Sequence, residues 1–344
     1  MAVTHNFDPS TRLGAVEEMS IHSLADVRKL FDAIGAQCQT VLQGRDETIA
    51  LVLIGLFADG HVLLEDHPGS GKTTLAKALG ESIRRSSEDG FAPYRRIQFT
   101  PDLLPSDITG GMMFDAESRQ FLFRPGPVFA NLILADEINR TSPKAQAALL
   151  EAMAEKQVTI DNQTYRLEEL FFVIATQNPL DLAGTYPLPR AQLDRFLFKI
   201  KMTYLDRAHE LEVLSRRRNV RSRSPGIAVS PQTLIAARRL MQDAVKIAPA
   251  IHDCLVDIAA ALRADRRVAL AISTRSLVMS LPALQARAMM LGRDYVAPKD
   301  VQALAVPMFA HRLELVPGVK DADQVVRECT APIVETLTRK SLAG

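Results

Sequence analysis

The chain has 344 residues, of which 47% are hydrophobic and 24% are charged. This length and composition predict a globular protein that buries a large core and folds as two domains. Its 41 basic and 40 acidic side chains give a formal net charge of +1, which excludes a whole-chain field that would attract nucleic acid or an anionic membrane.

The N-terminal segment, residues 1–20, is polar and contains acidic residues, so we expect a flexible tail rather than a signal peptide. The longest apolar run, residues 49–58, is too short to span a bilayer. Three scattered cysteines, Cys38, Cys254 and Cys329, lack metal-binding spacing and suit a reducing compartment. We therefore expect a soluble, cytoplasmic protein that does not bind membranes.

A core of helices and strands is predicted for residues 21–205. Apolar residues recur at helical spacing from Ser23 to Ile34 and again from Glu47 to Ala58. Short apolar runs then alternate with polar or helical sequence, which is typical of a parallel sheet with helical crossovers. These runs are residues 62–64, 96–99, 132–135, 171–175 and 196–200.

Residues 61–74, HVLLEDHPGSGKTT, combine an apolar strand, a glycine-containing turn and the start of a helix. Glycines let backbone N–H groups approach phosphate oxygens while the positive end of the helix faces the anion. Lys72 would contact the β- and γ-phosphates, and Thr73 would contact Mg²⁺. The usual first glycine of this pattern is Asp66 here, and the alternative is an ordinary turn with a solvated lysine. The predicted phosphate-binding residues are His67, Pro68, Gly69, Ser70, Gly71, Lys72, Thr73 and Thr74.

Two carboxylates follow the apolar run at residues 132–135, in the sequence LILADE. Parallel sheets bind ligands at the C-terminal ends of their strands. Asp136 could belong to the Mg²⁺ shell, through a water molecule, and Glu137 could polarise the attacking water. The alternative is an acidic lead into the helix predicted from Ser142.

Two further polar residues flank the later strands. Asn178 follows the strand at 171–176 and could position the attacking water, although an Asn-Pro turn is the alternative. Arg195 lies at the end of a predicted helix, just before the last strand, and could reach the γ-phosphate of a neighbouring subunit. The alternative for Arg195 is an intramolecular ion pair.

Strand-like runs end after Leu205. Residues 206–230 are expected to be a linker, and its basic run at 216–225 has a nucleic-acid contact as the alternative. Helical patterns at 231–245, 251–263 and 275–291 predict an all-α lid over residues 231–335, followed by a tail at 336–344, with Pro282 kinking the third helix. Arg275, at the start of that helix, would oppose the helix dipole, so it hints at an anionic partner and could close onto the same nucleotide.

Together these motifs resemble the MoxR-type AAA+ ATPases over residues 41–313. The matching segments are DHPGSGKT, LILADEINR, SPKAQAALLEAMAEKQVTI, VIATQNP, GTYPLPRAQLDRF, STR and GRDYVAPKD. The resemblance implies a P-loop NTPase, an α/β protein whose three-layer αβα domain has a parallel five-stranded sheet and is followed by an all-α lid, with ATP and Mg²⁺ as cofactors. It implies Walker A at Lys72 and Thr73, Walker B at Asp136 and Glu137, sensor one at Asn178, the arginine finger at Arg195, sensor two at Arg275, and an adenine pocket at Val41 and Gly44. One departure is Arg190, where such sequences often have glutamate.

The family resemblance also implies two hairpin insertions, which residues 114–123 and 158–167 can form because polar tips separate apolar arms. In AAA+ relatives such hairpins face the central pore or the client. The alternative is plain decoration of the sheet.

The resemblance implies a ring-forming remodelling ATPase, expected to be a homohexamer, with each active site completed by the adjacent subunit. MoxR-like proteins are thought to mature or activate partner complexes, often through a von Willebrand factor A (VWA) domain protein. No nucleic acid partner is expected. The alternatives are a DNA-directed AAA+ motor or loader, which should carry a basic track, and a non-catalytic nucleotide-gated scaffold.

Overall fold

The computed structural model describes residues 19–65, 70–83, 91–178, 184–216 and 228–343. Within these ranges, no helix is both long enough and apolar enough to cross a membrane. Asp66, His67, Pro68, Gly69 and most of the basic run at 216–225 lie outside the described residues, as does most of the N-terminal segment.

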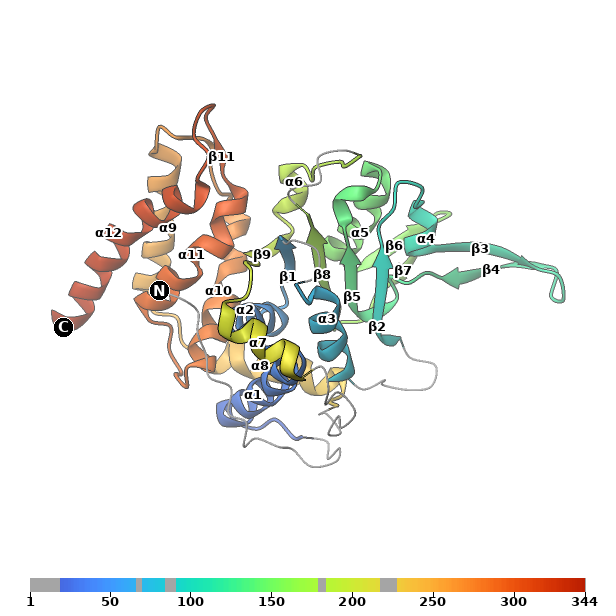
Figure 1. Cartoon of the computed structure of the whole chain (residues 1–344), viewed down its shortest axis with the longest axis horizontal. Helices are drawn as coiled ribbons and strands as arrows, with labels where there is room; N and C mark the ends of the chain where they lie inside the picture. The colour runs from blue at the N-terminus through green and yellow to red at the C-terminus, as the bar shows by residue number, and fades with distance from the viewer. Residues whose placement is uncertain (1–18, 66–69, 84–90, 179–183, 217–227, 344) are drawn as a thin grey trace.

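A five-stranded parallel sheet forms the centre of the first half of the chain (Figure 1). The five apolar runs of the sequence are its strands, which confirms the predicted α/β class. Since all five strands run in the same direction, their C-terminal ends lie at one edge of the sheet and their N-terminal ends at the other. In spatial order the strands are β2 (Ala92–Gln98), β5 (Ala130–Asp136), β8 (Phe172–Gln177), β1 (His61–Glu65) and β9 (Phe196–Lys201).

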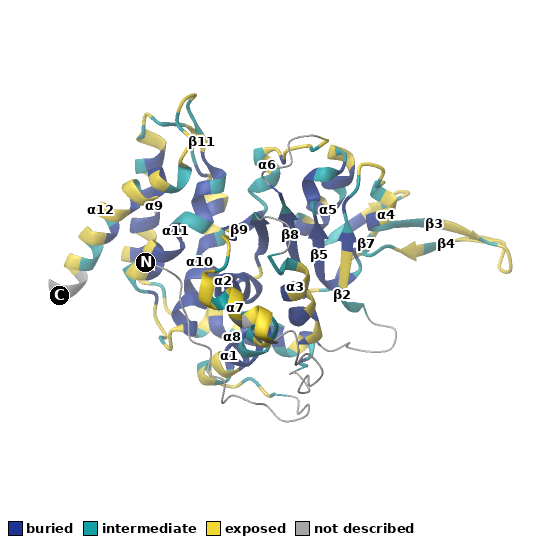
Figure 2. Cartoon of the chain, in the orientation of Figure 1, coloured by how far each residue is buried: buried dark blue, intermediate teal, exposed yellow. Residues whose placement is uncertain are grey.

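Helices cover both faces of the sheet, so the predicted three-layer arrangement is confirmed. Successive residues of a strand point to opposite faces, and Leu132 and Leu134 pack in one hydrophobic core while Ile133 packs in the other. Figure 2 shows the central strands as buried along most of their length. The first core includes α1 (Leu24–Val41), α2 (Asp46–Phe57) and α3 (Lys72–Glu81), whereas the second includes α5 (Pro143–Glu155) and the short α4 (Pro105–Thr109).

The lid is helical apart from a two-stranded antiparallel pair, β10 (Val268–Leu270) and β11 (Glu314–Leu315). Its apolar core is continuous with the core that α1 and α2 form below the sheet. Asp300 is fully buried in the lid and accepts hydrogen bonds from both Arg287 and Arg293, which neutralises its charge. The lid helices are α8 (Pro231–Ala244), α9 (Pro249–Ala264), α10 (Thr274–Met290), α11 (Pro298–Phe309) and α12 (Ala322–Ala343), with a 3₁₀ turn, η2, at Ala310–Arg312.

Two segments differ from the expected linker and tail. Helix α7 (Arg207–Arg216) begins after the last strand, where Asp206 accepts a hydrogen bond from the backbone N–H of His209 and so caps the helix. Helix α12 continues to Ala343, and Leu337, within the expected tail, packs against the lid core that also buries Val326 and Val334.

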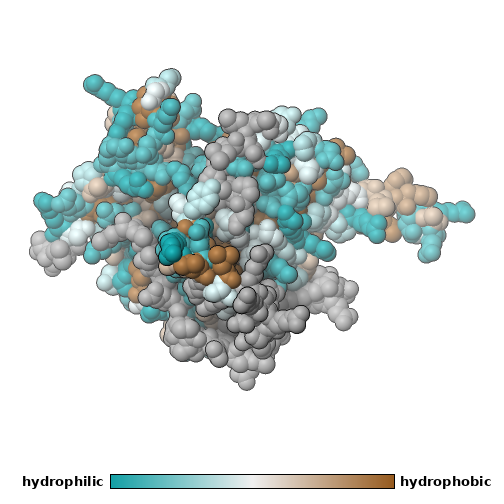
Figure 3. Space-filling model, viewed as in Figure 1, coloured by the Kyte–Doolittle hydropathy of each residue, from teal (hydrophilic) through white to brown (hydrophobic). Residues whose placement is uncertain are grey.

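Two antiparallel hairpins project from the core: β3 (Gly110–Asp115) with β4 (Gln120–Pro125), and β6 (Gln157–Ile160) with β7 (Gln163–Arg166). The first extends far from the body of the molecule, and Figure 3 shows apolar residues near its end. Phe123 stacks on Tyr165 with ring centroids 3.9 Å apart, so the two hairpins contact each other at their bases.

Candidate active site

Asp136 is the last residue of β5 and is buried at the C-terminal edge of the sheet. Thr176 of β8 donates a hydrogen bond to its Oδ1 at 2.8 Å, and Arg96 of β2 forms an ion pair with its Oδ2 at 2.6 Å. Neighbouring strands on both sides therefore fix the orientation of this carboxylate.

Glu137 follows with a left-handed backbone, φ 58° and ψ 49°, which is uncommon for a residue other than glycine. Its N–H donates to the Thr176 hydroxyl at 2.8 Å, which stabilises this turn. The side chain accepts a hydrogen bond from Gln98 at 3.0 Å and lies 3.3 Å from the Arg140 guanidinium. The turn separates the two carboxylates, so Asp136 and Glu137 can perform different tasks.

The phosphate loop ends at Gly71, which has a φ of 96° and precedes the first residue of α3, Lys72. A Cβ at Gly71 would come within 2.4 Å of Leu42 Cδ1, so both the backbone angle and the packing require glycine. Gly80, near the other end of α3, packs on Tyr94 in the first half of β2. Helix α3 therefore runs back along the sheet, and Lys72 lies at the C-terminal edge, with Thr73 exposed in the first turn.

The remaining residues predicted for the nucleotide lie near the same edge. Ser70 is half-buried beside Gly71, Thr74 is exposed next to Thr73, and Asn178 is buried directly after β8. Val41, half-buried, ends α1. Gly44 has a φ of 66° and lies against the His209 ring of α7, where a Cβ would come within 2.5 Å of Cγ. A cavity of about 740 Å³ opens beside Gly44, between the core and helices α11 and α12.

Arg195 lies at the opposite edge of the sheet. Strand β9 starts at the next residue, and Phe196 pairs with His61 at the start of β1. The length of β9 places Arg195 roughly 17 Å from the C-terminal edge. The alternative of an intramolecular ion pair is not seen, since no described carboxylate lies within ion-pair distance of Arg195, and Asp194 is bound by Arg312.

Arg275 is exposed at the start of α10, on the N-terminal side of the sheet. The neighbouring Ser276 donates a hydrogen bond to Asp194 at 3.0 Å, which places Arg275 close to Arg195. The structure therefore does not bring Arg275 over the nucleotide site that contains Lys72. The physical reason is that the lid packs along the outer strand β9 rather than over the C-terminal edge.

Four polar residues that contact the carboxylates were not predicted: Arg96, Gln98, Arg140 and Thr176. Arg96 and Gln98 have the period-two spacing that places side chains on one face of a strand, close to its C-terminal end. That spacing could have indicated from the sequence that Arg96 and Gln98 share one face of a strand. The sequence did not indicate the strand order that brings β2 beside β5.

The residues present suit a magnesium nucleotide. No group of three or more His, Cys, Asp or Glu side chains that could hold a metal occurs within the described ranges. Magnesium bound with a nucleotide needs only one or two protein oxygens, because phosphates and water supply the others. The hydroxyl of Thr73 and the carboxylate of Asp136 provide such oxygens, and Gly71, directly before Lys72, has no side chain to block the approach of a phosphate to its backbone N–H.

Comparison with known proteins agrees with this geometry. Residues 61–198 match the family described as "ATPase family associated with various cellular activities (AAA)", and residues 260–329 match the AAA lid domain. The chain is 43% identical to the uncharacterized protein YeaC of Bacillus subtilis, over 92% of this chain and 98% of that protein. It is 37% identical to the chaperone MoxR1 of Mycobacterium tuberculosis, over 85% of this chain and 77% of that protein.

A solved structure has the same fold. The crystal structure of a Cytophaga hutchinsonii protein, proposed to be an ATPase, superposes with a TM-score of 0.78 at 36% identity and covers 92% of this chain and 96% of that one.

Proposed function

The chain belongs to the MoxR-type AAA+ ATPases, and we propose that it hydrolyses ATP with Mg²⁺ at sites shared between adjacent subunits of a homo-oligomeric ring. We expect a hexamer. The observation that carries this proposal is the separation of the functional residues between two opposite edges of one sheet.

At the C-terminal edge, Lys72 would bind the β- and γ-phosphates and the backbone around Gly71 would donate to them. Thr73 and Asp136 would hold Mg²⁺, which supplies neutralisation of the phosphate charge when bound. Glu137 would accept a proton from the attacking water, and Asn178 would orient that water. Val41 and Gly44 would contact the adenine.

At the N-terminal edge, the length of β9 separates Arg195 from the proposed nucleotide site of its own subunit, and Arg275 directly precedes Ser276, which binds Asp194. A head-to-tail interface would place them at the γ-phosphate of the next subunit, because such an interface joins two different surfaces and closes into a ring. Arginine supplied in this way stabilises the charge that develops in the transition state.

We further propose that the ring acts as a cytoplasmic remodelling chaperone for a protein client, with a VWA-domain partner and without nucleic acid. The hairpin β3–β4 supports a protein-binding role, because Met113, Phe114, Phe121 and Leu122 are all exposed on it. A ring of the Glu137→Gln variant, which should bind ATP without hydrolysing it, should retain this client in a pull-down with ATP present.

The shared site is tested by mixing two inactive variants, Glu137→Gln and Arg195→Ala. Each variant alone should bind ATP without turnover. In a mixed ring, the Arg195→Ala subunit supplies an intact Glu137 and its neighbour supplies an intact Arg195, so random mixing should restore about a quarter of wild-type turnover. An assembled mixture that stays inactive would contradict the shared site.

A further inference from the structure

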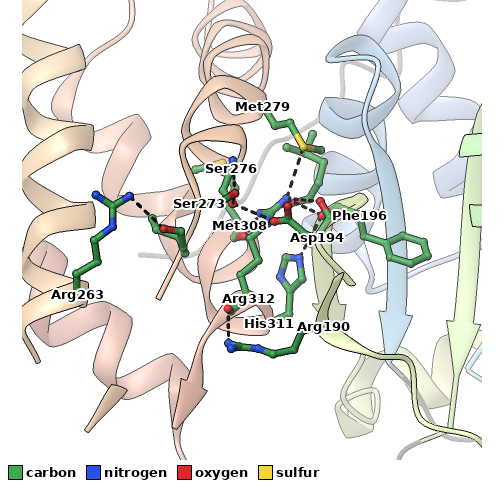
Figure 4. Close-up of polar contacts among 12 residues, drawn as sticks. Arg190, Asp194, Phe196, Arg263, Ser273, Ser276, Met279, Met308, His311 and Arg312 are labelled. Atoms are coloured by element: carbon green, nitrogen blue, oxygen red, sulfur yellow. Dashed lines mark hydrogen bonds and ion pairs between the residues drawn. The ribbon is translucent and has the colours of Figure 1, made fainter. Parts of the chain in front are cut away.

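Helix α6 (Arg190–Leu193), which immediately precedes Arg195, is bound to the lid at its first residue. Arg190 forms an ion pair with Glu314 at 3.1 Å and donates a hydrogen bond to the backbone carbonyl of Leu270. It also donates to the backbone carbonyl of Arg312 (Figure 4). Arg190 belongs to the core, but its side chain therefore contacts three residues of the lid. A glutamate at this position could not donate to these carbonyls.

The far end of α6 is bound to the lid as well. Asp194 accepts hydrogen bonds from Arg312 Nε at 2.9 Å and from the Ser276 hydroxyl at 3.0 Å. The Arg312 side chain is only 2% exposed. Burial lowers the pKa of Arg312, and the attraction of Asp194 opposes that shift. We call Arg190, Asp194, Ser276 and Arg312 the lid clamp.

Arg312 holds the backbone on both sides of Arg195. Its Nη2 donates to the Phe196 carbonyl at 2.8 Å and to the Asp194 carbonyl at 3.4 Å. His311 also contacts the Phe196 carbonyl, at 3.1 Å. In contrast, Nε of Arg195 is buried and has no hydrogen-bond partner among the described residues. No hydrogen bond from this nitrogen to a described residue fixes the Arg195 side chain, whereas the lid binds the backbone on either side of Arg195.

We propose that Arg190 and Arg312 are positioning residues that couple the lid of one subunit to ATP hydrolysis in the next. A lid that moves away from α6 breaks the clamp and releases the segment that carries Arg195. Hydrolysis then stops at the neighbour's nucleotide, while the nucleotide site in the same subunit is unaffected. This inference rests on the proposed shared site.

The variants are chosen to keep the fold. Removing Asp194 would leave the buried Arg312 charge unpaired, which is strongly destabilising. Arg190→Met is milder, because this side chain is 26% exposed and its aliphatic stem is retained. Arg312→Met and Arg312→Lys complete the set, and the lysine keeps the charge but loses the fork that contacts Asp194 and Phe196 together. Arg239→Met, which breaks an exposed ion pair with Glu169 in the full chain, is the matched control.

We expect Arg190→Met and Arg312→Met to bind ATP within twofold of wild type and to lose at least about tenfold in turnover, a fraction of the loss from removing the arginine itself. Arg312→Lys should recover only part of this loss, and Arg239→Met should behave as wild type. If Arg312→Met does not fold, Arg190→Met alone carries the test.

Mixing distinguishes positioning from general damage. A clamp variant mixed with Glu137→Gln should regain turnover, because intact clamps then face intact Glu137 residues, whereas the same variant mixed with Arg195→Ala should not. Recovery with Arg195→Ala, or full turnover of both clamp variants alone, would overturn the inference. Failure of the clamp variants to recover with Glu137→Gln, while Arg195→Ala does recover, would overturn it as well. Failure of the Arg195→Ala and Glu137→Gln mixture itself would instead overturn the proposed shared site.

Discussion

The two edges of the central sheet are built in different ways. At the C-terminal edge, Asp136, Glu137 and their partner Thr176 all belong to the αβα core. At the N-terminal edge, Arg195 follows a core helix but its backbone is bound by Arg312 of the lid. The carboxylate half of the site is thus a property of one domain, whereas the arginine half depends on how two domains pack.

Each edge also contains an arginine–aspartate ion pair, and the two pairs differ in burial. The Arg96 side chain beside Asp136 is 46% exposed, while the Arg312 side chain beside Asp194 is 2% exposed. Because the Arg96 guanidinium is half-exposed, water can solvate it when it leaves Asp136, so in the proposed site Asp136 would exchange Arg96 for Mg²⁺. The Arg312 side chain is buried, so its separation from Asp194 is costly and requires a movement of the lid itself. The Arg96–Asp136 pair is therefore suited to ligand exchange, whereas the Arg312–Asp194 pair is suited to coupling the lid to the core.

The largest expected effect is at the N-terminal edge. Arg195→Ala should lower turnover by about 10³ to 10⁵, because an arginine supplied by a neighbour stabilises transition-state charge by that factor. ATP affinity should be unchanged, since Arg195 lies at the other edge from Lys72. Steady-state ATPase and equilibrium nucleotide binding measure the two effects, with the exposed Arg339→Ala as control. A large loss of ATP affinity would place Arg195 in the nucleotide site of its own subunit and would contradict the comparison of the two edges.

At the C-terminal edge, Glu137→Gln should lower turnover by about 10² to 10⁴, the usual contribution of a general base. Binding should persist, because the amide can keep the hydrogen-bonding distance to Gln98. The control is Glu151→Gln on the exposed side of α5. Turnover near the wild-type rate would show that another group activates the water, leaving Glu137 as a structural residue of the turn.

The C-terminal edge was largely predictable from the sequence, for physical reasons. The strand-turn-helix order around Lys72 and the carboxylates after a buried strand are local patterns, and parallel strands must end at one edge. The sheet and its helical layers follow from the same periodicity. Position along a strand therefore fixed which residues would meet.

The packing of the lid could not be predicted in this way. The pattern around Arg275 indicated a helix start but not which edge of the sheet that helix would approach. Arg190 looked only like a departure from its relatives, because its partners Leu270 and Glu314 are far away in sequence. Likewise, Asp206 gave a cap to α7 in a segment whose composition indicated a linker.

A smaller effect is expected from Arg96. Without its guanidinium, Asp136 keeps its contact with Thr176 but loses the cation that competes with Mg²⁺. One charge-assisted hydrogen bond is worth about 1.5 kcal/mol, so Arg96→Met should lower the Mg²⁺ concentration for half-maximal ATP binding about tenfold. Arg95→Met, on an exposed neighbouring residue of β2, is the control. If Arg96→Met instead raised the Mg²⁺ concentration needed, Arg96 would be assigned to stabilising the Mg²⁺-bound state rather than to competing with Mg²⁺.

The smallest expected effect is the dependence of stability on pH at the N-terminal edge. His61 starts β1, is buried, and contacts the Met153 carbonyl at 3.2 Å while accepting from the Val173 N–H at 3.1 Å. Burial lowers its pKa from 6.5 to about 4. The unfolded chain therefore takes up the proton first as the pH falls below 6.5, and stability is lost between pH 6.5 and 4.

Between pH 7.5 and pH 5.5, His61 should remove about 1.4 kcal/mol from the free energy of unfolding. His61→Gln should lose this part of the pH dependence, because glutamine does not titrate and its amide can still accept from Val173. Urea unfolding at the two pH values measures the difference, and His252→Gln, on an exposed residue, should keep the wild-type dependence. An unchanged dependence in His61→Gln would assign the acid sensitivity to His311, whose pKa is also lowered by burial and which contacts Phe196 beside Arg195. In either case the acid-sensitive group lies at the N-terminal edge of the sheet, beside the start of β1 or of β9.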